Sequence, residues 1–160
     1  KDLHTHSTCN TAIVRGKVMA MPSKILLPVR GGPQAELSLR IAMSLRAKEI
    51  DALHFVSPDI RVDSAFKGLS RVFPSVPGVR PRYETSSNPA EQIVEESRQA
   101  DLVVMGGTAM PIEANSSFGV VADRVLKESS TPVILVQSVA KLPQYYEEDI
   151  LEALLKKAHS

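Results

Sequence analysis

The stretch Asp101–Val136, DLVVMGGTAMPIEANSSFGVVADRVLKESSTPVILV, contains the pattern that decides the fold. It predicts a buried strand at 101–105, a loop of small residues, a helix at 119–128 and a second buried strand at 132–137. A parallel strand that runs through a glycine loop into a helix directs free backbone N–H groups at one point, where the helix dipole favours negative charge. The stretch therefore predicts a phosphate-type ligand near Gly106 and Gly119.

The same alternation of strand and helix extends upstream. Apolar runs predict strands at 24–29, 50–56 and 80–85, and helical spacing of apolar residues predicts helices at 33–47, 63–73 and 88–99. Alternating strands and helices predict an α/β fold with a doubly wound parallel sheet. In such sheets ligands bind beyond the carboxyl ends of the strands, where the strand order switches.

The composition of the chain excludes several classes of protein. The chain has 160 residues, a formal net charge of +1 and one cysteine. Its basic residues are scattered, which argues against a nucleic-acid partner, and a single cysteine excludes an internal disulfide framework. No apolar run approaches the roughly 20 residues of a membrane span, and the first residues lack the build of a signal peptide. We therefore expect a cytoplasmic location.

Four segments carry a resemblance to a known family: ILLPVRGG, HFVS, NPAEQIVEESRQADLVVMGG and SSFGVVADRVLKESSTPVILV. Together they resemble the universal stress protein (UspA) family over Lys24–Ser138. The resemblance implies a five-stranded parallel sheet of order 3-2-1-4-5 with a Rossmann-like fold. It also implies frequent dimerisation through the last strand and, in many members, an ATP site.

The family's nucleotide signature, G-x2-G-x9-G-[ST], corresponds here to Gly106, Ala109, Gly119 and Val120, so two of its four positions depart. Ala109 adds a Cβ where backbone must approach phosphate, at about 1 kcal/mol if a glycine conformation is needed. Val120 lacks a hydroxyl donor that would contribute roughly 0.5–1.5 kcal/mol. Arg30 replaces a common acidic residue, and its guanidinium can hold phosphate.

We therefore predict weak binding of an adenine nucleotide, ATP or AMP, in a regulatory domain that is not an enzyme. The resemblance places adenine against the ends of the first two strands and phosphates over the glycine loop. The predicted nucleotide-binding residues are Pro28, Val29, Arg30, Val56, Met105, Gly106, Gly107, Ala109, Gly119, Val120 and Val121. The alternative is a nucleotide-free dimerisation or interaction module that keeps only the fold, which the departures at Arg30, Ala109 and Val120 favour.

The N-terminal DLHTHST resembles the opening of PHP-type metal-dependent phosphoesterases, in which two histidines, here His4 and His6, bind metal. That chemistry needs more histidine and aspartate ligands than this chain offers, so we expect no metal site. His54 lies within a predicted strand and is expected to be a hydrogen-bonded core histidine. Cys9 is expected to pack at a strand edge rather than act as a nucleophile.

A similarity between two segments of the sequence accounts for the N-terminal residues better than a metal site does. Thr11–Arg15 parallels Val133–Gln137, each after a Ser-Thr pair. We interpret 1–23 as the tail of a preceding UspA-like repeat plus a linker. We predict that 3–14 is ordered and pairs as a strand with an existing sheet edge.

The remaining domain boundaries are 24–138 for the UspA-like domain and 139–160 for a segment with an amphipathic helix at 145–158. Tandem domains of this kind resemble the cytosolic tails of some bacterial ion antiporters, chloride channels and amino-acid permeases, so a linked membrane transporter is one hypothesis. The apolar strand Val133–Val136 predicts a homodimer at that sheet edge.

Overall fold

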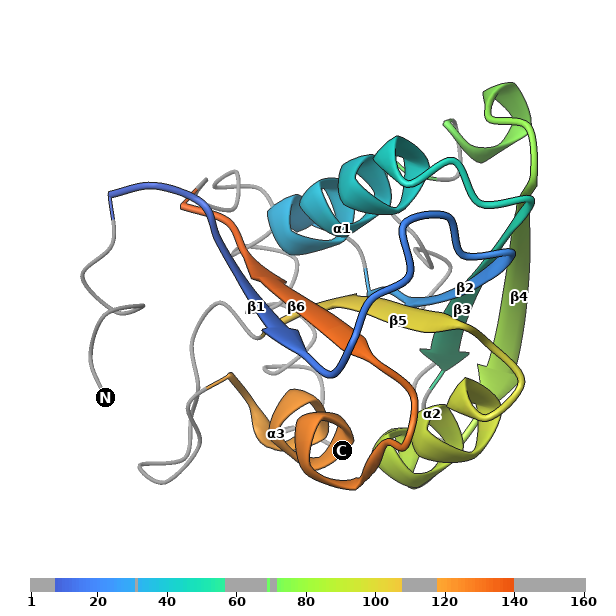
Figure 1. Ribbon diagram of the computed structural model, residues 1–160. Coiled ribbons are helices and arrows are strands. Elements are labelled where there is room, and N and C mark those ends of the chain that lie inside the picture. Colours follow the sequence, from blue (N-terminus) through green and yellow to red (C-terminus); the bar gives the residue numbers. More distant parts are fainter. Residues whose placement is uncertain (1–7, 31, 57–68, 70–71, 108–117, 140–160) are drawn as a thin grey trace, which may run out of the picture.

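The computed structural model describes residues 8–30, 32–56, 69, 72–107 and 118–139, which form one sheet of six strands with helices on both faces (Figure 1). The sheet order is β1-β6-β5-β2-β3-β4. The strands are β1 (Thr11–Arg15), β2 (Lys24–Pro28), β3 (Glu49–Val56), β4 (Val79–Thr85), β5 (Leu102–Gly106) and β6 (Val133–Gln137). The helices are α1 (Gly32–Ser44), α2 (Pro89–Ser97) and α3 (Val120–Glu128), with a short 3-10 turn η2 (Phe73–Ser75).

The predicted α/β class and the doubly wound arrangement are confirmed. Read from β4 to β6, the five parallel strands follow the expected order 3-2-1-4-5, and each neighbouring pair in this series is parallel. The sheet has six strands rather than five, because β1 adds to β6 in the antiparallel direction.

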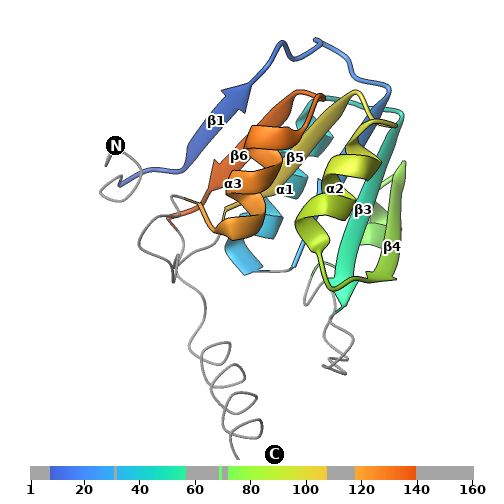
Figure 2. The ribbon, with the colours of Figure 1, turned by 90° about the horizontal axis from the view of Figure 1, so that it is seen from below.

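Two apolar clusters hold the layers together, one on each face of the sheet. Figure 2 shows α2 and α3 side by side over one face and α1 on the other. Alternate residues of β2 divide between these faces, with Ile25 and Leu27 under α1 and Leu26 under the opposite helices. Strands buried on both faces need nearly continuous apolar sequence, which explains the predicted apolar runs.

The start of α2 follows its sequence signature. Asn88 caps the helix, its side-chain oxygen accepting the Glu91 N–H at 3.5 Å while its amide donates to the Glu91 carboxylate at 2.6 Å. The predicted cap at Asn88 and its partner Glu91 are present, but the capping box is only half formed, because the Asn88 backbone N–H donates to the Ser86 hydroxyl at 3.0 Å instead of to Glu91. The helix predicted at 63–73 falls largely outside the described residues, and Phe73 itself begins η2 instead. The amphipathic helix predicted at 145–158 also lies outside them.

Of the segment predicted to pair as a strand, 3–14, the structure has Thr11–Arg15 as a strand, whereas 3–7 lie outside the described residues. Side-chain hydrogen bonds hold this strand at both ends. The Arg15 guanidinium donates to the Ser129 carbonyl and, at 3.2 Å, to the Thr131 carbonyl. At the other end, the Asn10 side chain accepts the Val139 N–H at 3.0 Å. Cys9 is exposed, which corrects the expectation that it packs, because it precedes the first residue that pairs with β6.

Candidate functional site

The carboxyl ends of β2 and β5 form the point at which strand order switches. The connection from β2 leaves through α1 over one face of the sheet, and the connection from β5 leads to α3 on the other face. Two helix N-termini therefore flank the same edge of the sheet, and Gly32 starts α1 there with a φ of 81°. An edge of this kind is the usual ligand position in open α/β sheets.

The predicted nucleotide-binding residues gather at this edge, which we call the switch-point crevice. Pro28, Val56 and Gly106 are the last residues of β2, β3 and β5. Val29, Met105 and Gly119 are buried, Val121 is half-buried, and Arg30 and Val120 are exposed. Gly107 directly follows β5 and is buried. Ala109 lies outside the described residues.

Gly106 and Gly107 have structural roles that the sequence pattern does not reveal. A Cβ on Gly106 would lie 2.6 Å from the Cβ of Gln34, so the glycine allows α1 to approach β5. The Gly107 N–H donates to the Val136 carbonyl at 2.9 Å. The sheet therefore already uses the Gly107 N–H as a donor in this conformation, and a nucleotide contact at Gly107 stays a prediction.

The start of α3 carries a carboxylate of its own. Gly119 is the N-cap residue, and its φ of 96° is a conformation that glycine adopts without strain. One residue before it, the Phe118 N–H donates to the Asp123 carboxylate at 3.2 Å. This negative charge lies where a phosphate group was predicted and opposes it. An aspartate in the first turn of the helix was the sequence signal for this cap.

His54 lies near the end of β3, next to the predicted adenine position. Its Nδ1 is 2.8 Å from the Val29 carbonyl, and because a carbonyl only accepts, Nδ1 carries the proton. Burial lowers the pKa of His54, and the nearby Arg30 lowers it further, although the bond to Val29 acts in the opposite direction. The predicted hydrogen bond is confirmed, but the ring is half-buried rather than in the core.

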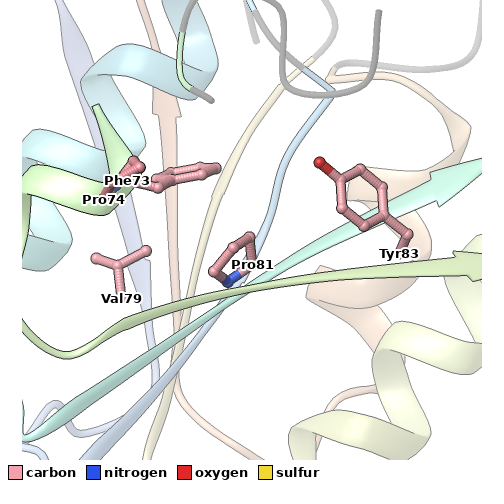
Figure 3. Close-up of a pocket in the computed structure, with 5 residues that line it drawn as sticks. All are labelled: Phe73, Pro74, Val79, Pro81 and Tyr83. Carbon is pink, nitrogen blue, oxygen red and sulfur yellow. The ribbon is translucent and has the colours of Figure 1, made fainter. Parts of the chain in front are cut away.

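A concavity lies over β4 and η2. It is a hollow of about 160 Å³ lined by Phe73, Pro74, Val79, Pro81 and Tyr83 (Figure 3). The Tyr83 and His54 rings pack edge-on, with 6.3 Å between their centroids. This hollow shares no residue with the switch-point crevice and has no charged lining residue, so it is unsuited to phosphate.

Within 8–30, 32–56, 69, 72–107 and 118–139, no group of three or more His, Cys, Asp or Glu side chains could hold a metal ion. In the same part of the chain no helix has the length and apolarity needed to cross a membrane. His4 and His6 fall outside it.

Solved structures share this arrangement. The hypothetical protein MJ0577 is 22% identical with a TM-score of 0.58, and the match covers 76% of this chain and 99% of that one. A universal stress protein from Archaeoglobus fulgidus is 21% identical with a TM-score of 0.56, covering 73% and 98% of the two chains. UspA from Lactobacillus plantarum is 18% identical with a TM-score of 0.55, covering 73% and 99%. The chain has the universal stress protein fold.

At these identities the universal stress protein likeness establishes the fold alone. No protein-family model and no curated protein matches the sequence. A further universal stress protein from Archaeoglobus fulgidus DSM 4304 matches over 72% of this chain but only 44% of its own. The fold therefore also occurs in that longer chain beside additional sequence.

Proposed function

We propose that this universal-stress-protein-like domain is regulatory and binds an adenine nucleotide, ATP or AMP, weakly at the switch-point crevice. One observation carries the proposal: α1 and α3 both begin where β2 and β5 end, at the point at which strand order switches. Backbone donors at two helix N-termini and an exposed Arg30 suit phosphate there. The domain has no role as an enzyme in this proposal.

The apolar strand ends suit the base. Pro28, Val29 and Val56 provide an apolar surface at the carboxyl ends of β2 and β3. The neutral His54 beside Val29 keeps this end of the crevice uncharged apart from Arg30. An adenine ring against these residues leaves its phosphates directed along β5 towards α3.

A ligand in the switch-point crevice could affect the β6 and β1 edge of the sheet through few intervening contacts. The Gly107 N–H bonds to the Val136 carbonyl, which joins the end of β5 to β6, and β6 pairs with β1. A nucleotide that shifts the loop after β5 would therefore alter the packing of β6 and β1. We propose that this shift signals to a linked protein, with a transporter on the cytoplasmic side of a membrane as the leading hypothesis.

Calorimetric titration of the full chain with ATP and with AMP tests the proposal. We expect a dissociation constant of about tens of micromolar or weaker, that is, no more than about 7 kcal/mol of binding free energy. Arg30→Ala should weaken binding, whereas Lys17→Ala removes an equal charge from an exposed residue in the β1–β2 connection and should not. Submicromolar binding would contradict the weak site.

A second candidate function is a nucleotide-free interaction module. The Asp123 carboxylate at the start of α3 and the occupied Gly107 amide favour it, because both reduce what the crevice offers a phosphate. Absence of heat with either nucleotide at millimolar concentration, together with unchanged thermal stability, would support this function over the first.

A further inference from the structure

The strands β1 and β6 are related by a local two-fold axis. Each has five residues, Thr11–Arg15 and Val133–Gln137, and they pair in the antiparallel direction. The first residue of each strand lies opposite the last residue of the other, and the two central residues, Ile13 and Leu135, lie opposite one another. This register is the one that two copies of a single strand adopt across a symmetric interface.

The side chains follow the same correspondence. Val14 matches Val136 in type, Ile13 matches Leu135, and both strands end in a long polar residue, Arg15 in β1 and Gln137 in β6. The Arg15 Nε and the Gln137 Oε1 are both buried without a hydrogen-bond partner among the described residues. The two polar ends thus occupy equivalent and incompletely satisfied positions.

The two strands differ in how firmly they are held. Leu135 and Val136 are 2% and 0% exposed, whereas Ile13 and Val14 are 38% and 56% exposed. Figure 2 shows β1 at the margin of the sheet, beyond α3. Outside its ladder with β6, β1 depends chiefly on the end contacts of Arg15 and Asn10. A strand that buries little surface can be displaced by a strand that buries more.

We propose that β1 masks the outer edge of β6, the edge at which the sequence predicts a homodimer, by taking the place of β6 from a second copy of this chain. When β1 leaves, two copies pair through β6 with Leu135 opposite Leu135. The amide of Gln137 then replaces Arg15 as the donor near the carbonyls of Ser129 and Thr131. The homodimer expected from the apolar strand is thereby conditional on the release of β1.

Sedimentation equilibrium of the full chain tests this at about tens of micromolar, the range of weak interfaces. The unchanged chain should have the mass of one copy, 17.4 kDa. The double variant Asn10→Ala/Arg15→Ala removes both end contacts and should shift the average mass towards twice that value. Lys17→Ala is the matched control, since Lys17 is exposed, and should remain a monomer.

A cysteine at the two-fold axis gives a second, independent measurement. In a Cys9→Ser background, Leu135→Cys should form an interchain disulfide only when Asn10→Ala/Arg15→Ala is also present. A synthetic peptide of residues 8–16, added in excess, should suppress that disulfide. The proposal is overturned if the double variant is folded by circular dichroism yet stays a monomer, or if Leu135→Cys crosslinks equally well with β1 docked.

Truncation provides a further check that does not depend on the point variants. Removal of 1–22 should produce the same dimer and the same Leu135→Cys crosslink. If the truncated chain fails to fold, the double variant still decides the outcome, because it keeps the full length of the chain and all six strands.

Discussion

Asp51 and Arg82, from neighbouring strands, form a two-bond ion pair. The Arg82 Nε lies 2.7 Å from the Asp51 Oδ1, and its Nη2 lies 2.9 Å from the Oδ2. The Asp51 side chain is only 6% exposed, whereas that of Arg82 is 35% exposed. Arg82 also reaches Glu96 of α2 at 2.8 Å, so one guanidinium joins β3, β4 and α2. The bond to Asp51 is the largest of the influences that raise the pKa of Arg82.

Arg82→Met should therefore destabilise the fold, because it leaves a buried carboxylate without its main partner. Lys24, whose Nζ lies 3.9 Å from the Asp51 carboxylate, compensates only in part. We expect the free energy of unfolding to fall by about 2–3 kcal/mol, at or below the lower end for a broken buried pair because Arg82 is part-exposed.

Urea denaturation of Arg82→Met and of a control measures this loss. Arg80→Met is the control, because the exposed Arg80 pairs with Glu49 at 3.3 Å and should lose less than about 1 kcal/mol. Equal losses in the two variants would contradict a special role for the Asp51 pair.

The contact between Gly106 and Gln34 predicts a compensating pair of substitutions. Gly106→Ala should cost about 1–3 kcal/mol, since its Cβ would lie 2.6 Å from that of Gln34. Gln34→Gly alone should cost about 1 kcal/mol as a helix glycine. The double variant should be more stable than the sum of the two predicts, because the shortest contact, with the Gln34 Cβ, is gone and only backbone contacts of 3.3 Å or more remain.

Gly107→Ala is the control for this pair. Its Cβ would lie 3.4 Å from Phe118, a contact that needs little or no adjustment, so the loss should be smaller. Strict additivity of Gly106→Ala and Gln34→Gly in chemical denaturation would show that α1 does not approach β5 as closely as described.

His54 makes stability depend on pH in a stated direction. Its folded-state pKa lies below 6.5, so the unfolded chain takes up a proton that the folded chain refuses. The contribution of His54 to the free energy of unfolding is complete above pH 6.5. It declines as the pH falls towards the folded-state pKa, by at most about 1.4 kcal/mol per pH unit. His54→Asn keeps a donor for the Val29 carbonyl and should flatten this part of the profile. A profile unchanged by His54→Asn would assign the dependence to other groups.

Restoring the nucleotide signature should strengthen ATP binding if the crevice is a nucleotide site. Ala109→Gly/Val120→Ser together should contribute about 1.5–3 kcal/mol, or roughly 10- to 150-fold. Calorimetric titration against the unchanged chain measures the gain. No binding by the double variant would favour the interaction module.

Asp123→Asn isolates the charge at the start of α3. An asparagine oxygen still accepts the Phe118 N–H, so the cap remains while the negative charge is lost. We expect about 2- to 5-fold tighter ATP binding, the effect of one charge at a helix terminus. Asp101→Asn is the control, because Asp101 accepts the N–H groups of Ser23 and Lys24 at the start of β2, at the amino end of the strands. Equal gains from both variants would indicate a general charge effect.

The sequence predicts those features that depend on local pattern. Apolar runs and the cap at Asn88 place the strands and α2, and the similarity of Thr11–Arg15 to Val133–Gln137 anticipates a docked strand. The sequence does not reveal that the Gly107 amide is taken by Val136, or that Gly106 touches Gln34, because both contacts join residues brought together only by the packed sheet. Glycine spacing alone cannot distinguish close packing from ligand approach.

The opposite edge of the described sheet sets a limit on assembly. The Ile50 N–H donates to the Gly78 carbonyl at 2.8 Å, and the alternation of a parallel ladder then turns the backbone nitrogens of Val79, Pro81 and Tyr83 outward from β4. Proline has no N–H, so a strand arriving at this edge meets a missing donor at Pro81. Pairing between sheets is therefore disfavoured at the β4 edge. If two copies pair through β6 as proposed above, both free ends of the joined sheet are β4 edges, and the missing donor at Pro81 opposes further growth into a filament.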